Sequence, residues 1–313
     1  MTKYRALAGL ATIALLALTA CGSSSNPVAA DSSSTSAAGS ASGSSGGGAI
    51  TIGSADFPES ALVAEIYAGA LQAKGVQVSK KLSIGSREVY IPAIKDGSID
   101  LIPEYSGNLL AYFDKTSKAV SSTDVYAALP KALPSSLKVL AQSTAEDKDA
   151  IVVTKATADK YKLTSIADLA PVAKDLTLGA PPEFETRVDG IPGLKAKYGV
   201  TFTSFKKLDT GGPLTVAALK NGQVQAADIF STDPSIAANG WTVLADPQFL
   251  YTAQNVLPLI NGAKANDTVT AALDAVSAKL DTATLTTLVA QVVTDKKDAA
   301  TVAAAWLKTN NLA

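Results

Sequence analysis

The chain has 313 residues, a length that accommodates about two domains, and 47% of the residues are hydrophobic. Its formal net charge is −1 and it has no basic stripe, which argues against a nucleic-acid-binding protein. Histidine is absent and cysteine occurs once, so the most common general base, the usual metal ligands and any disulfide are missing. We therefore expect no cofactor and no metal site, and an enzyme is disfavoured.

Residues 1–20 have the pattern of a secretory signal peptide. Lys3 and Arg5 precede an apolar run at 6–20, which is too short and wrongly flanked for a permanent membrane span. The ending Leu-Thr-Ala-Cys at 18–21 resembles a bacterial lipobox, in which the cysteine is acylated and becomes the first residue of the mature protein. This predicts a lipid anchor at Cys21, on the extracytoplasmic face of the bacterial cell membrane. Without the signal, 25 basic and 28 acidic residues leave a net charge of −3.

Residues 21–48 consist almost entirely of Ser, Gly, Ala, Thr and Pro. Such a composition cannot bury enough apolar surface to offset its ordering entropy, so it predicts a disordered tether. A Gly/Ser-rich coil of this length reaches roughly 30 Å. The folded body could therefore move above a membrane surface.

The first predicted lobe begins with a strand at 50–53 and a helix with Asp56 as its N-cap. A second strand at 76–82 and a helix at 88–95 lead into a buried strand that ends at Tyr105. Two short helices and a strand at 137–140 complete this α/β unit.

A polar segment at 142–149 precedes the next strand and is the predicted crossing to a second lobe. The remaining elements of that lobe are expected as helices at 156–161, 165–173 and 213–221 and strands at 150–154, 176–178, 201–205 and 242–244. The chain returns through 249–255 into an apolar strand at 256–260, and three final helices are expected to pack on the first lobe. We thus predict lobe 1 at 49–146 plus 253–313, lobe 2 at 147–252, and a two-crossing hinge.

One segment of the sequence occurs twice, at 92–108 and again, altered, at 216–233. Each copy predicts a helix end, a glycine, a short strand and an aromatic residue next to a hydroxyl, Tyr105-Ser106 and Phe230-Ser231. Because ligands bind beyond the carboxyl ends of strands in open α/β sheets, both aromatic rings are expected at a ligand between two lobes. The alternative is coincidence, since helix–glycine–strand units are common in α/β proteins.

Charged residues add candidate ligand contacts. Arg87 and Arg187 are the only arginines after the signal, against 23 lysines, and each follows a predicted strand. Only a guanidinium offers a planar bidentate clamp for a carboxylate; an ion pair between loops is the alternative role. Asp147 and Asp149 in the first crossing could face a cation or could form a solvated turn.

Aromatic residues at strand ends or crossings are Tyr105, Phe230 and Tyr251. Aromatic faces attract quaternary ammonium groups, which cannot donate hydrogen bonds. A single aromatic residue is more often part of a core than of a cage.

Several segments resemble the glycine betaine/choline/carnitine-binding proteins of osmoprotectant ABC transporters, in particular their ProX/OpuC-like branch. These segments are Ile52 to Glu59, Ala93 to Gly107, Phe184 to Gly193, and Phe230 to Asp233. The resemblance implies a two-lobed α/β periplasmic-binding-protein fold of type II that captures a quaternary ammonium solute and hands it to a membrane permease. It also implies cage roles for Tyr105 and Tyr251, a carboxylate-binding role for Arg187 and a place for Asp147 in the crossing.

Three positions depart from that family pattern. Phe230 lacks the hydroxyl of the usual tyrosine, Asp149 replaces an aromatic residue, and Ala55 stands where relatives often have lysine. These departures weaken the case for glycine betaine itself, and they leave a larger, more hydroxylated or more cationic solute open.

We therefore expect a lipid-anchored, monomeric substrate-binding protein that delivers a compatible solute to an ABC permease. The expected ligand-binding residues are Tyr105, Tyr251, Arg187, Phe230, Asp147, Asp149, Arg87, Asp56, Asn108 and Thr232. One alternative is a binding protein of the same fold for another carboxylate or aromatic molecule. A surface enzyme, for which Glu183 and Glu185 could supply a carboxylate pair, is a second.

Overall fold

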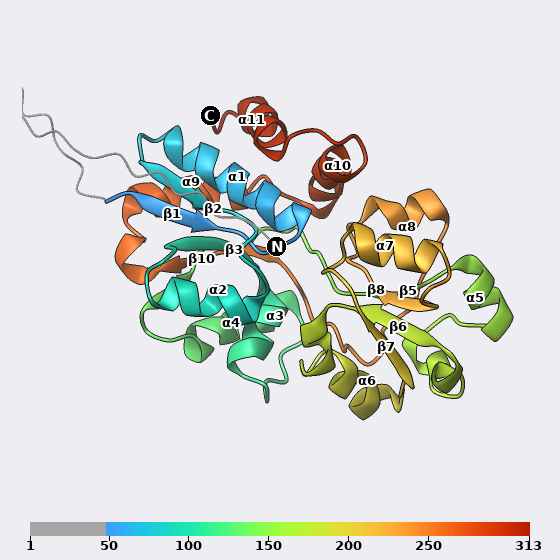
Figure 1. The fold of residues 1–313 in the computed structure, drawn as a ribbon. Helices are drawn as coiled ribbons and strands as arrows, with labels where there is room; N and C mark the ends of the chain where they lie inside the picture. Colours follow the sequence, from blue (N-terminus) through green and yellow to red (C-terminus); the bar gives the residue numbers. More distant parts are fainter. Residues whose placement is uncertain (1–47) are drawn as a thin grey trace, which may run out of the picture. The chain divides into compact units, whose positions relative to one another are not determined.

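The computed structural model describes residues 48–313, which form two five-stranded sheets flanked by helices (Figure 1). The predicted signal peptide, Cys21 and nearly all of the predicted tether lie outside the described residues. No helix in the described part is both long and apolar enough to cross a membrane.

The first sheet has the strand order β2-β1-β3-β10-β4. Its strands are β1 (Ile50–Gly53), β2 (Val78–Lys81), β3 (Leu101–Tyr105), β4 (Leu137–Val139) and β10 (Val256–Asn261). Strand β1 runs parallel to β2 and β3, and β10 runs antiparallel to β3 and β4. Strand β10 therefore comes from a part of the chain far from the other four strands.

Helices cover both faces of the first sheet. One face carries α1 (Pro58–Gln72), α9 (Asp267–Ser277), α10 (Thr282–Val293) and α11 (Ala299–Thr309). The other face carries α2 (Arg87–Lys95), α3 (Ser106–Phe113) and α4 (Ser122–Ala132). Helix α1 is buried along most of its length because it lies between the sheet and the C-terminal helices, and each fully buried Leu, Val or Ile contributes about 1.5–3 kcal/mol. The three C-terminal helices pack on this lobe, as the sequence predicts.

The second sheet repeats the arrangement of the first, in the order β7-β6-β8-β5-β9. Its strands are β5 (Ile151–Val153), β6 (Thr177–Ala180), β7 (Ser204–Lys207), β8 (Ala226–Asp228) and β9 (Thr242–Val243). Strand β6 is parallel to β7 and β8, and β5 is antiparallel to β8 and β9. The helices of this lobe are α5 (Lys155–Tyr161), α6 (Ile191–Tyr198), α7 (Pro213–Lys220) and α8 (Pro234–Asn239).

The sequence repeat falls on equivalent parts of the two sheets. Its first copy is the end of α2 followed by β3, its second is the end of α7 followed by β8, and both strands are central. The glycines between helix and strand, Gly97 and Gly222, have φ values of 81° and 70°, in the left-handed region that glycine adopts without strain. Each copy thus forms the turn from a helix into the central strand of its lobe.

Four local predictions are wrong, and one of them is the strand expected at 201–205, which is displaced to Ser204–Lys207 as β7. Residues 165–173 do not form one α-helix but two 3₁₀ helices, Ile166–Leu169 and Ala173–Asp175, because Pro171 between them lacks the N–H that a continuous helix needs. Asp56 does not cap α1: Phe57 holds the N-cap position and makes no side-chain cap. The second strand is shorter than expected, with only residues 78–81 paired to β1.

The two segments that connect the lobes run side by side in opposite directions. The backbone N–H of Ser143 donates to the carbonyl of Val256 at 2.8 Å, and that of Val256 donates to Ala145 at 3.0 Å. Further along, Asp147 N–H donates to Gln254 at 3.2 Å. Two hydrogen-bonded crossings are the geometry of a hinge, in which a few backbone torsions absorb the movement of whole lobes.

Candidate functional site

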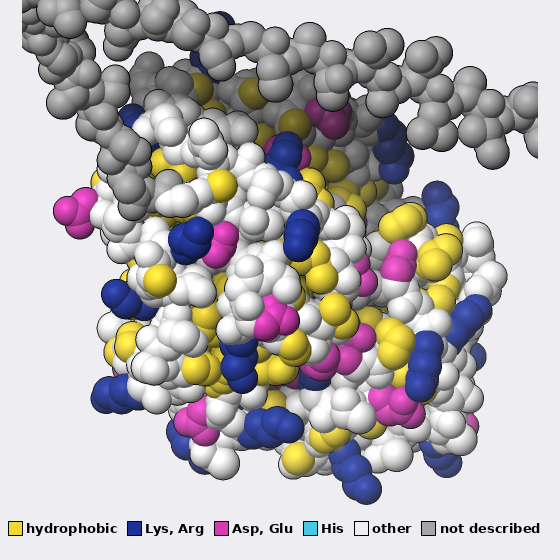
Figure 2. Space-filling view, turned by 60° about the vertical axis from the view of Figure 1, so that its left-hand side comes forward, with side chains coloured by type: hydrophobic (Ala, Val, Ile, Leu, Met, Phe, Trp, Pro, Cys, Tyr) yellow, Lys and Arg dark blue, Asp and Glu magenta, His cyan; other side chains and the backbone are white. Residues whose placement is uncertain are grey.

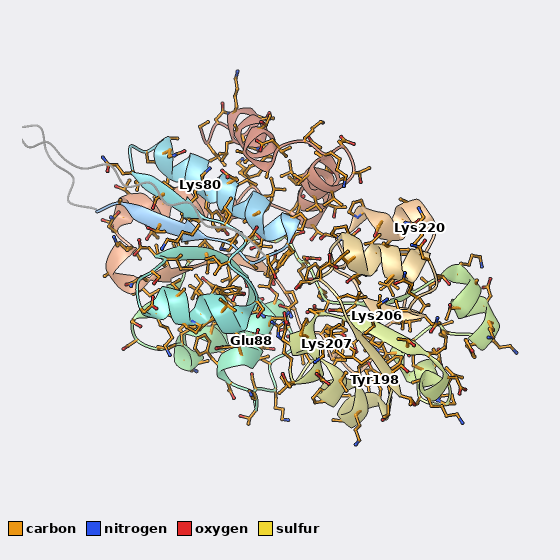
Figure 3. The ribbon with its side chains drawn as sticks, in the orientation of Figure 1. Lys80, Glu88, Tyr198, Lys206, Lys207 and Lys220 are labelled. Carbon is orange, nitrogen blue, oxygen red and sulfur yellow. The ribbon has the colours of Figure 1, made fainter. Side chains whose placement is uncertain are left out.

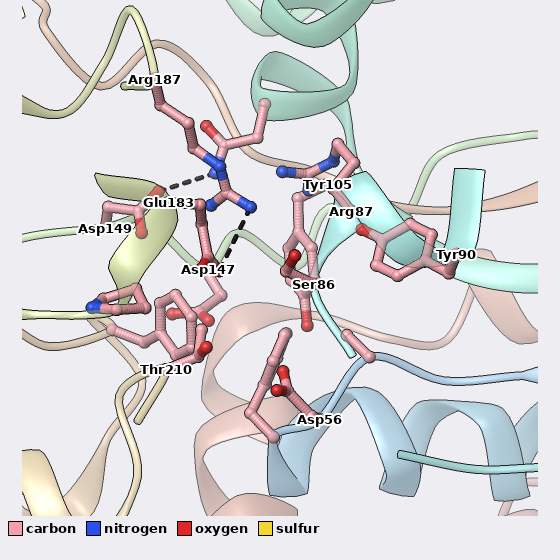
Figure 4. A pocket seen from close by; sticks show the side chains of 15 residues that line it. Asp56, Ser86, Arg87, Tyr90, Tyr105, Asp147, Asp149, Glu183, Arg187 and Thr210 are labelled. Carbon is pink, nitrogen blue, oxygen red and sulfur yellow. Dashed lines mark hydrogen bonds and ion pairs between the residues drawn. The ribbon is translucent and has the colours of Figure 1, made fainter. Parts of the chain in front are cut away.

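A small cavity lies between the lobes, where the central strands β3 and β8 end (Figure 4). It encloses about 30 Å³, which is room for one or two water molecules. Eight of the ten residues expected at the ligand line it, namely Asp56, Arg87, Tyr105, Asn108, Asp147, Asp149, Arg187 and Phe230. The cavity wall does not include Thr232 or Tyr251. Both lobes and the first crossing therefore contribute to one site.

Aromatic rings form one wall of the cavity. The ring of Phe57 lies 4.8 Å from that of Phe230 and 5.9 Å from that of Tyr105, measured between centroids. Phe57 is the last residue of the loop between β1 and α1, and it is not among the ligand contacts expected from the sequence. The signal that could have found it is its position in a loop between the end of a strand and the start of a helix.

Arg87 forms a buried ion pair inside the first lobe. Its Nε and Nη2 donate to Glu104 Oε1 and Oε2 at 2.9 and 2.8 Å, and Tyr90 Oη donates to Oε1 at 2.8 Å. Burial opposes the charge of Arg87, but the charge and hydrogen bonds of Glu104 raise its pKa well above the ordinary value. A guanidinium has five N–H donors, so Arg87 keeps donors beyond the two that Glu104 accepts.

Arg187 connects the two lobes. It donates from Nε and Nη2 to the two carboxylate oxygens of Glu88 at 3.1 and 2.9 Å, and Glu183 lies 3.5 Å from Nη2. Glu88 stands at the end of α2 that faces the second lobe (Figure 3). Burial would raise the pKa of Glu88, but the hydrogen bond and charge of Arg187 outweigh it and lower the pKa to about 2. Both candidate clamps for a ligand carboxylate are thus engaged by carboxylates of the protein.

A buried group of carboxyls ties α1 to the crossing and to the second lobe. Glu59 accepts hydrogen bonds from Tyr105 Oη at 2.8 Å and from Thr232 Oγ1 at 2.7 Å. Asp147 accepts from the backbone N–H of Thr232 at 3.0 Å and from Ser231 Oγ at 3.2 Å. Burial raises the pKa of both acids, and for Asp147 the charge of Glu59 raises it further. Asp147 is therefore one half of a carboxyl pair that favours retaining a proton.

Asn108 joins the first lobe to both crossings. Its side chain donates to Asp149 Oδ2 at 2.7 Å and accepts from the amide of Gln254, while its backbone N–H donates to Gln254 Oε1 at 2.9 Å. The neighbouring Gly107 packs so closely on the return crossing that a Cβ there would lie 2.6 Å from the carbonyl oxygen of Ala253. This contact explains why a glycine follows the aromatic–serine pair in the first repeat copy.

Two larger cavities adjoin the small one. A cavity of about 440 Å³ against α7, α8 and α10 shares Phe57 and Phe230 with it, and Thr232 lies there. Another of about 420 Å³ shares Arg87, Asn108 and Arg187 with it and includes Glu88. The small cavity is thus bounded by the paired phenylalanine rings on one side and by the Arg187–Glu88 ion pair on another. A solute larger than water enters only when these walls move.

Charged side chains of both signs are interspersed on the face of the described residues in Figure 2. No extended basic patch is visible on that face. Among residues 48–313, no group of three or more acidic, histidine or cysteine side chains is placed to hold a metal ion.

Two α/β lobes of matching strand order, joined by two crossings around a cavity of arginines, acids and aromatic rings, define a two-lobed binding protein. Sequence comparison specifies the family. The chain belongs to the OpuAC family, the substrate binding domain of the ABC-type glycine betaine transport system, whose model matches residues 48–309.

Individual relatives agree with this assignment. The chain is 30% identical over 273 residues to the glycine betaine-binding protein YehZ of Escherichia coli K12, which covers 83% of the chain and 90% of YehZ. It is 25% identical over 277 residues to a glycine-betaine-binding protein of Pseudomonas aeruginosa, covering 84% and 88%. Its fold matches the crystal structure of a glycine betaine/carnitine/choline ABC transporter protein with a TM-score of 0.66 at 22% identity, over 84% of the chain and 99% of that structure. The prediction of a two-lobed periplasmic-binding-protein fold is confirmed.

Proposed function

We propose that the protein captures a quaternary ammonium compatible solute, such as choline, carnitine or glycine betaine, between its lobes and delivers it to an ABC importer in the membrane. The observation that carries this proposal is the convergence of four aromatic rings, two arginines and several acids on one interlobe cavity in a member of this family. The aromatic faces would hold the cation. The small volume of the cavity implies that the lobes part to admit the solute and close over it.

Arg187 is the residue that we propose for a solute carboxylate. Its fork already binds two oxygens of Glu88, which is the contact that a solute carboxylate would replace. A carboxylate-bearing solute would therefore compete with Glu88, whereas a solute without a carboxylate would leave the ion pair in place. Arg87, Asp56, Asn108 and Asp149 would line the rest of the cavity.

We further propose that the mature protein is a monomeric lipoprotein anchored through Cys21, with residues 147–252 moving as one lobe. The lipobox-like ending at residues 18–21 and the Ser/Gly-rich segment that follows support an anchor with a tether. The hydrogen-bonded crossings support a hinge at the two boundaries of that lobe.

The experiment that tests the function is a ligand screen by thermal unfolding. A ligand that binds only the folded state raises the melting temperature by mass action. Glycine betaine, choline, carnitine, proline betaine and ectoine are compared with amino acids and plain carboxylates. We expect a shift confined to quaternary ammonium compounds. A shift with carboxylates or amino acids alone would instead support a binding protein of the same fold for another solute, and conversion of a bound solute, seen by mass spectrometry, would indicate an enzyme.

A further inference from the structure

Three buried polar atoms of the second lobe have no hydrogen-bond partner among the described residues: Ser235 Oγ in α8, Asp228 Oδ1 and Tyr251 Oη. Asp228 and Tyr251 are only 2% and 6% exposed. A carboxylate oxygen and a hydroxyl lose their water on burial and need a replacement partner, so orphaned atoms of this kind in a binding protein point to a partner that comes from outside.

Neither Asp228 nor Tyr251 lines the interlobe cavity, but neighbours of Asp228 do. Asp228 is the last residue of β8 and pairs with Ile151, the first residue of β5, and Asp149 lies two residues before that strand. Asp149 lines the cavity, as does Phe230, two residues after Asp228. Tyr251 lies in the return crossing and packs in the core of this lobe.

The surroundings of these atoms are acidic. The charged groups that face Asp228 are Asp149 and Asp189, which repel its negative charge, and Arg187, which attracts it. Burial raises the pKa of the Tyr251 hydroxyl, and the negative charges of Asp228, Asp149, Asp189 and Asp246 raise it further. The hydroxyl donates a hydrogen bond to none of these carboxyls.

No cation of the described residues forms an ion pair with this acidic group. Asp149, Asp189 and Asp228 take part in no ion pair there, and Arg187 forms its ion pairs with Glu88 and Glu183. Burial raises the pKa of Asp228 well above its usual range, and the neighbouring acids raise it further. A positively charged solute would relieve this repulsion.

Hydrogen bonding narrows the chemistry of that solute. A trimethylammonium group has no N–H, and glycine betaine has no donor of any kind. Its cationic group could neutralise the negative charge but could not donate a hydrogen bond to Asp228 Oδ1. A cationic solute that also carries a hydroxyl or an N–H group would satisfy both requirements.

We propose that Asp228 and Tyr251 form a hydrogen-bond subsite of the solute cavity, which binds a hydroxyl or N–H group of a cationic solute and so selects such solutes over glycine betaine. This proposal rests on the proposed function. The proposal includes a path by which a solute reaches the subsite. Asp149 accepts a hydrogen bond from Asn108 of the first lobe, so separation of the lobes would release Asp149 and give a solute access to Asp228.

The test compares two probes that differ in one donor: choline and its O-methyl ether, which have the same charge and the same trimethylammonium group. Binding of each to the purified protein is measured by isothermal titration calorimetry, with glycine betaine as a third probe. We expect choline to bind about tenfold more tightly than the ether, because the ether leaves the buried acceptor unpaired. Equal affinities for choline and the ether would overturn the subsite.

Two variants locate the effect. Tyr251→Phe removes only the hydroxyl and should reduce the preference for choline over the ether at least threefold. Asp228→Asn should weaken both cations, because it removes the charge that they share. Tyr161→Phe, at the end of α5 in the same lobe, is the matched control and should keep the parent preference. An unchanged preference in Tyr251→Phe, with an unchanged melting temperature, would contradict the assignment.

A second measurement tests whether Asp228 loses its proton when choline binds. Because a cation favours the ionised form of Asp228, binding of choline should release protons, and its affinity should rise with pH. Calorimetry in two buffers of different ionisation enthalpy measures this release, which Asp228→Asn should abolish. If no quaternary ammonium compound binds the parent protein, the proposed function fails. If glycine betaine binds as tightly as choline and the hydroxyl has no effect, only the subsite fails.

Discussion

Arg187 of the second lobe donates two parallel hydrogen bonds to Glu88 of the first, beside the interlobe cavity. A bidentate contact of this kind is the one that a guanidinium makes with the carboxylate of a zwitterionic solute. Under the proposed function, Glu88 therefore competes with a solute carboxylate for Arg187, and its ion pair with Arg187 holds the two lobes together.

The first prediction concerns this competition. Glu88→Gln removes the charge that holds Arg187, so glycine betaine, which carries a carboxylate, should bind about threefold to tenfold more tightly, while choline should change little. Isothermal titration calorimetry measures both. Glu185→Gln is the control, since Glu185 pairs with Lys207 at the surface of the second lobe. If glycine betaine gains nothing from Glu88→Gln, Arg187 does not bind its carboxylate.

The same ion pair has a defined pH range. The pKa of Glu88 is lowered from 4.5 to about 2, so the contribution of the ion pair to folding is fully present above about pH 4.5 and is lost as the pH falls through about 2. We expect the ratio of the glycine betaine affinities of Glu88→Gln and the parent to be constant between pH 5 and 8. A ratio that falls to one within this range would show that Glu88 is not ionised there.

The aromatic wall gives the second prediction. Phe57→Ala and Phe230→Ala each remove a ring face next to the cavity, and each should weaken choline binding by about tenfold, or roughly 1.4 kcal/mol. Phe249→Ala is the control, because Phe249 is 55% exposed and lies outside the cavity wall. Choline affinities that match the parent in both wall variants would exclude a role of these rings in cation binding.

The Glu59–Asp147 pair predicts a pH dependence of stability. The pKa of Asp147 is raised in the folded protein, so folding favours its protonated form, and the free energy of unfolding falls as pH rises above the ordinary pKa of about 4. Asp147→Asn keeps the shape but cannot ionise. Its melting temperature should fall less between pH 5 and 8 than that of the parent. Parallel curves would mean that the pair does not retain a proton.

Gly107 predicts a steric effect at the crossing. A Cβ at this position would meet Thr252 Oγ1 and the carbonyl oxygen of Ala253 at less than 3.0 Å, so Gly107→Ala should destabilise the fold by about 1–3 kcal/mol. Gly262→Ala is the control, since its nearest contacts are 3.4 Å away. Urea unfolding of the two variants measures the difference. Equal stabilities would show that the crossing shifts freely.

The last prediction concerns the membrane anchor. Cys21→Ser removes the only thiol in the chain, so the protein should lose incorporation of radiolabelled palmitate and appear in the soluble fraction. The parent should stay with the membrane after a high-salt wash. Labelling that persists in Cys21→Ser would place the lipid elsewhere.

Much of the fold could be predicted because it depends on local patterns. The repeat of a helix end, a glycine and a short buried strand located β3 and β8, and both became central strands. The resemblance to a family drew attention to the ends of those strands, and most of the residues selected there line one cavity.

The partners of those residues could not be predicted, because they come from distant parts of the chain. Arg187 and Glu88 are 99 residues apart, and Thr232 and Glu59 are 173 apart. Glu104 left a readable signal: it is a charged residue in a fully buried strand and therefore needs a partner, which is Arg87. Asp228 gives the same signal at the end of the buried strand β8, but its Oδ1 has no hydrogen-bond partner among the described residues.

The matching strand order of the two sheets brings one central strand end from each lobe, β3 and β8, to the interlobe cavity. Tyr105 and Phe230 hold equivalent positions after the central strands, and they differ by a single phenolic oxygen. That oxygen donates to Glu59, so one copy carries a polar network where the other presents only a ring. A symmetrical scaffold can distinguish the head of a small molecule from its tail only where its halves have diverged, and this pair is one such place.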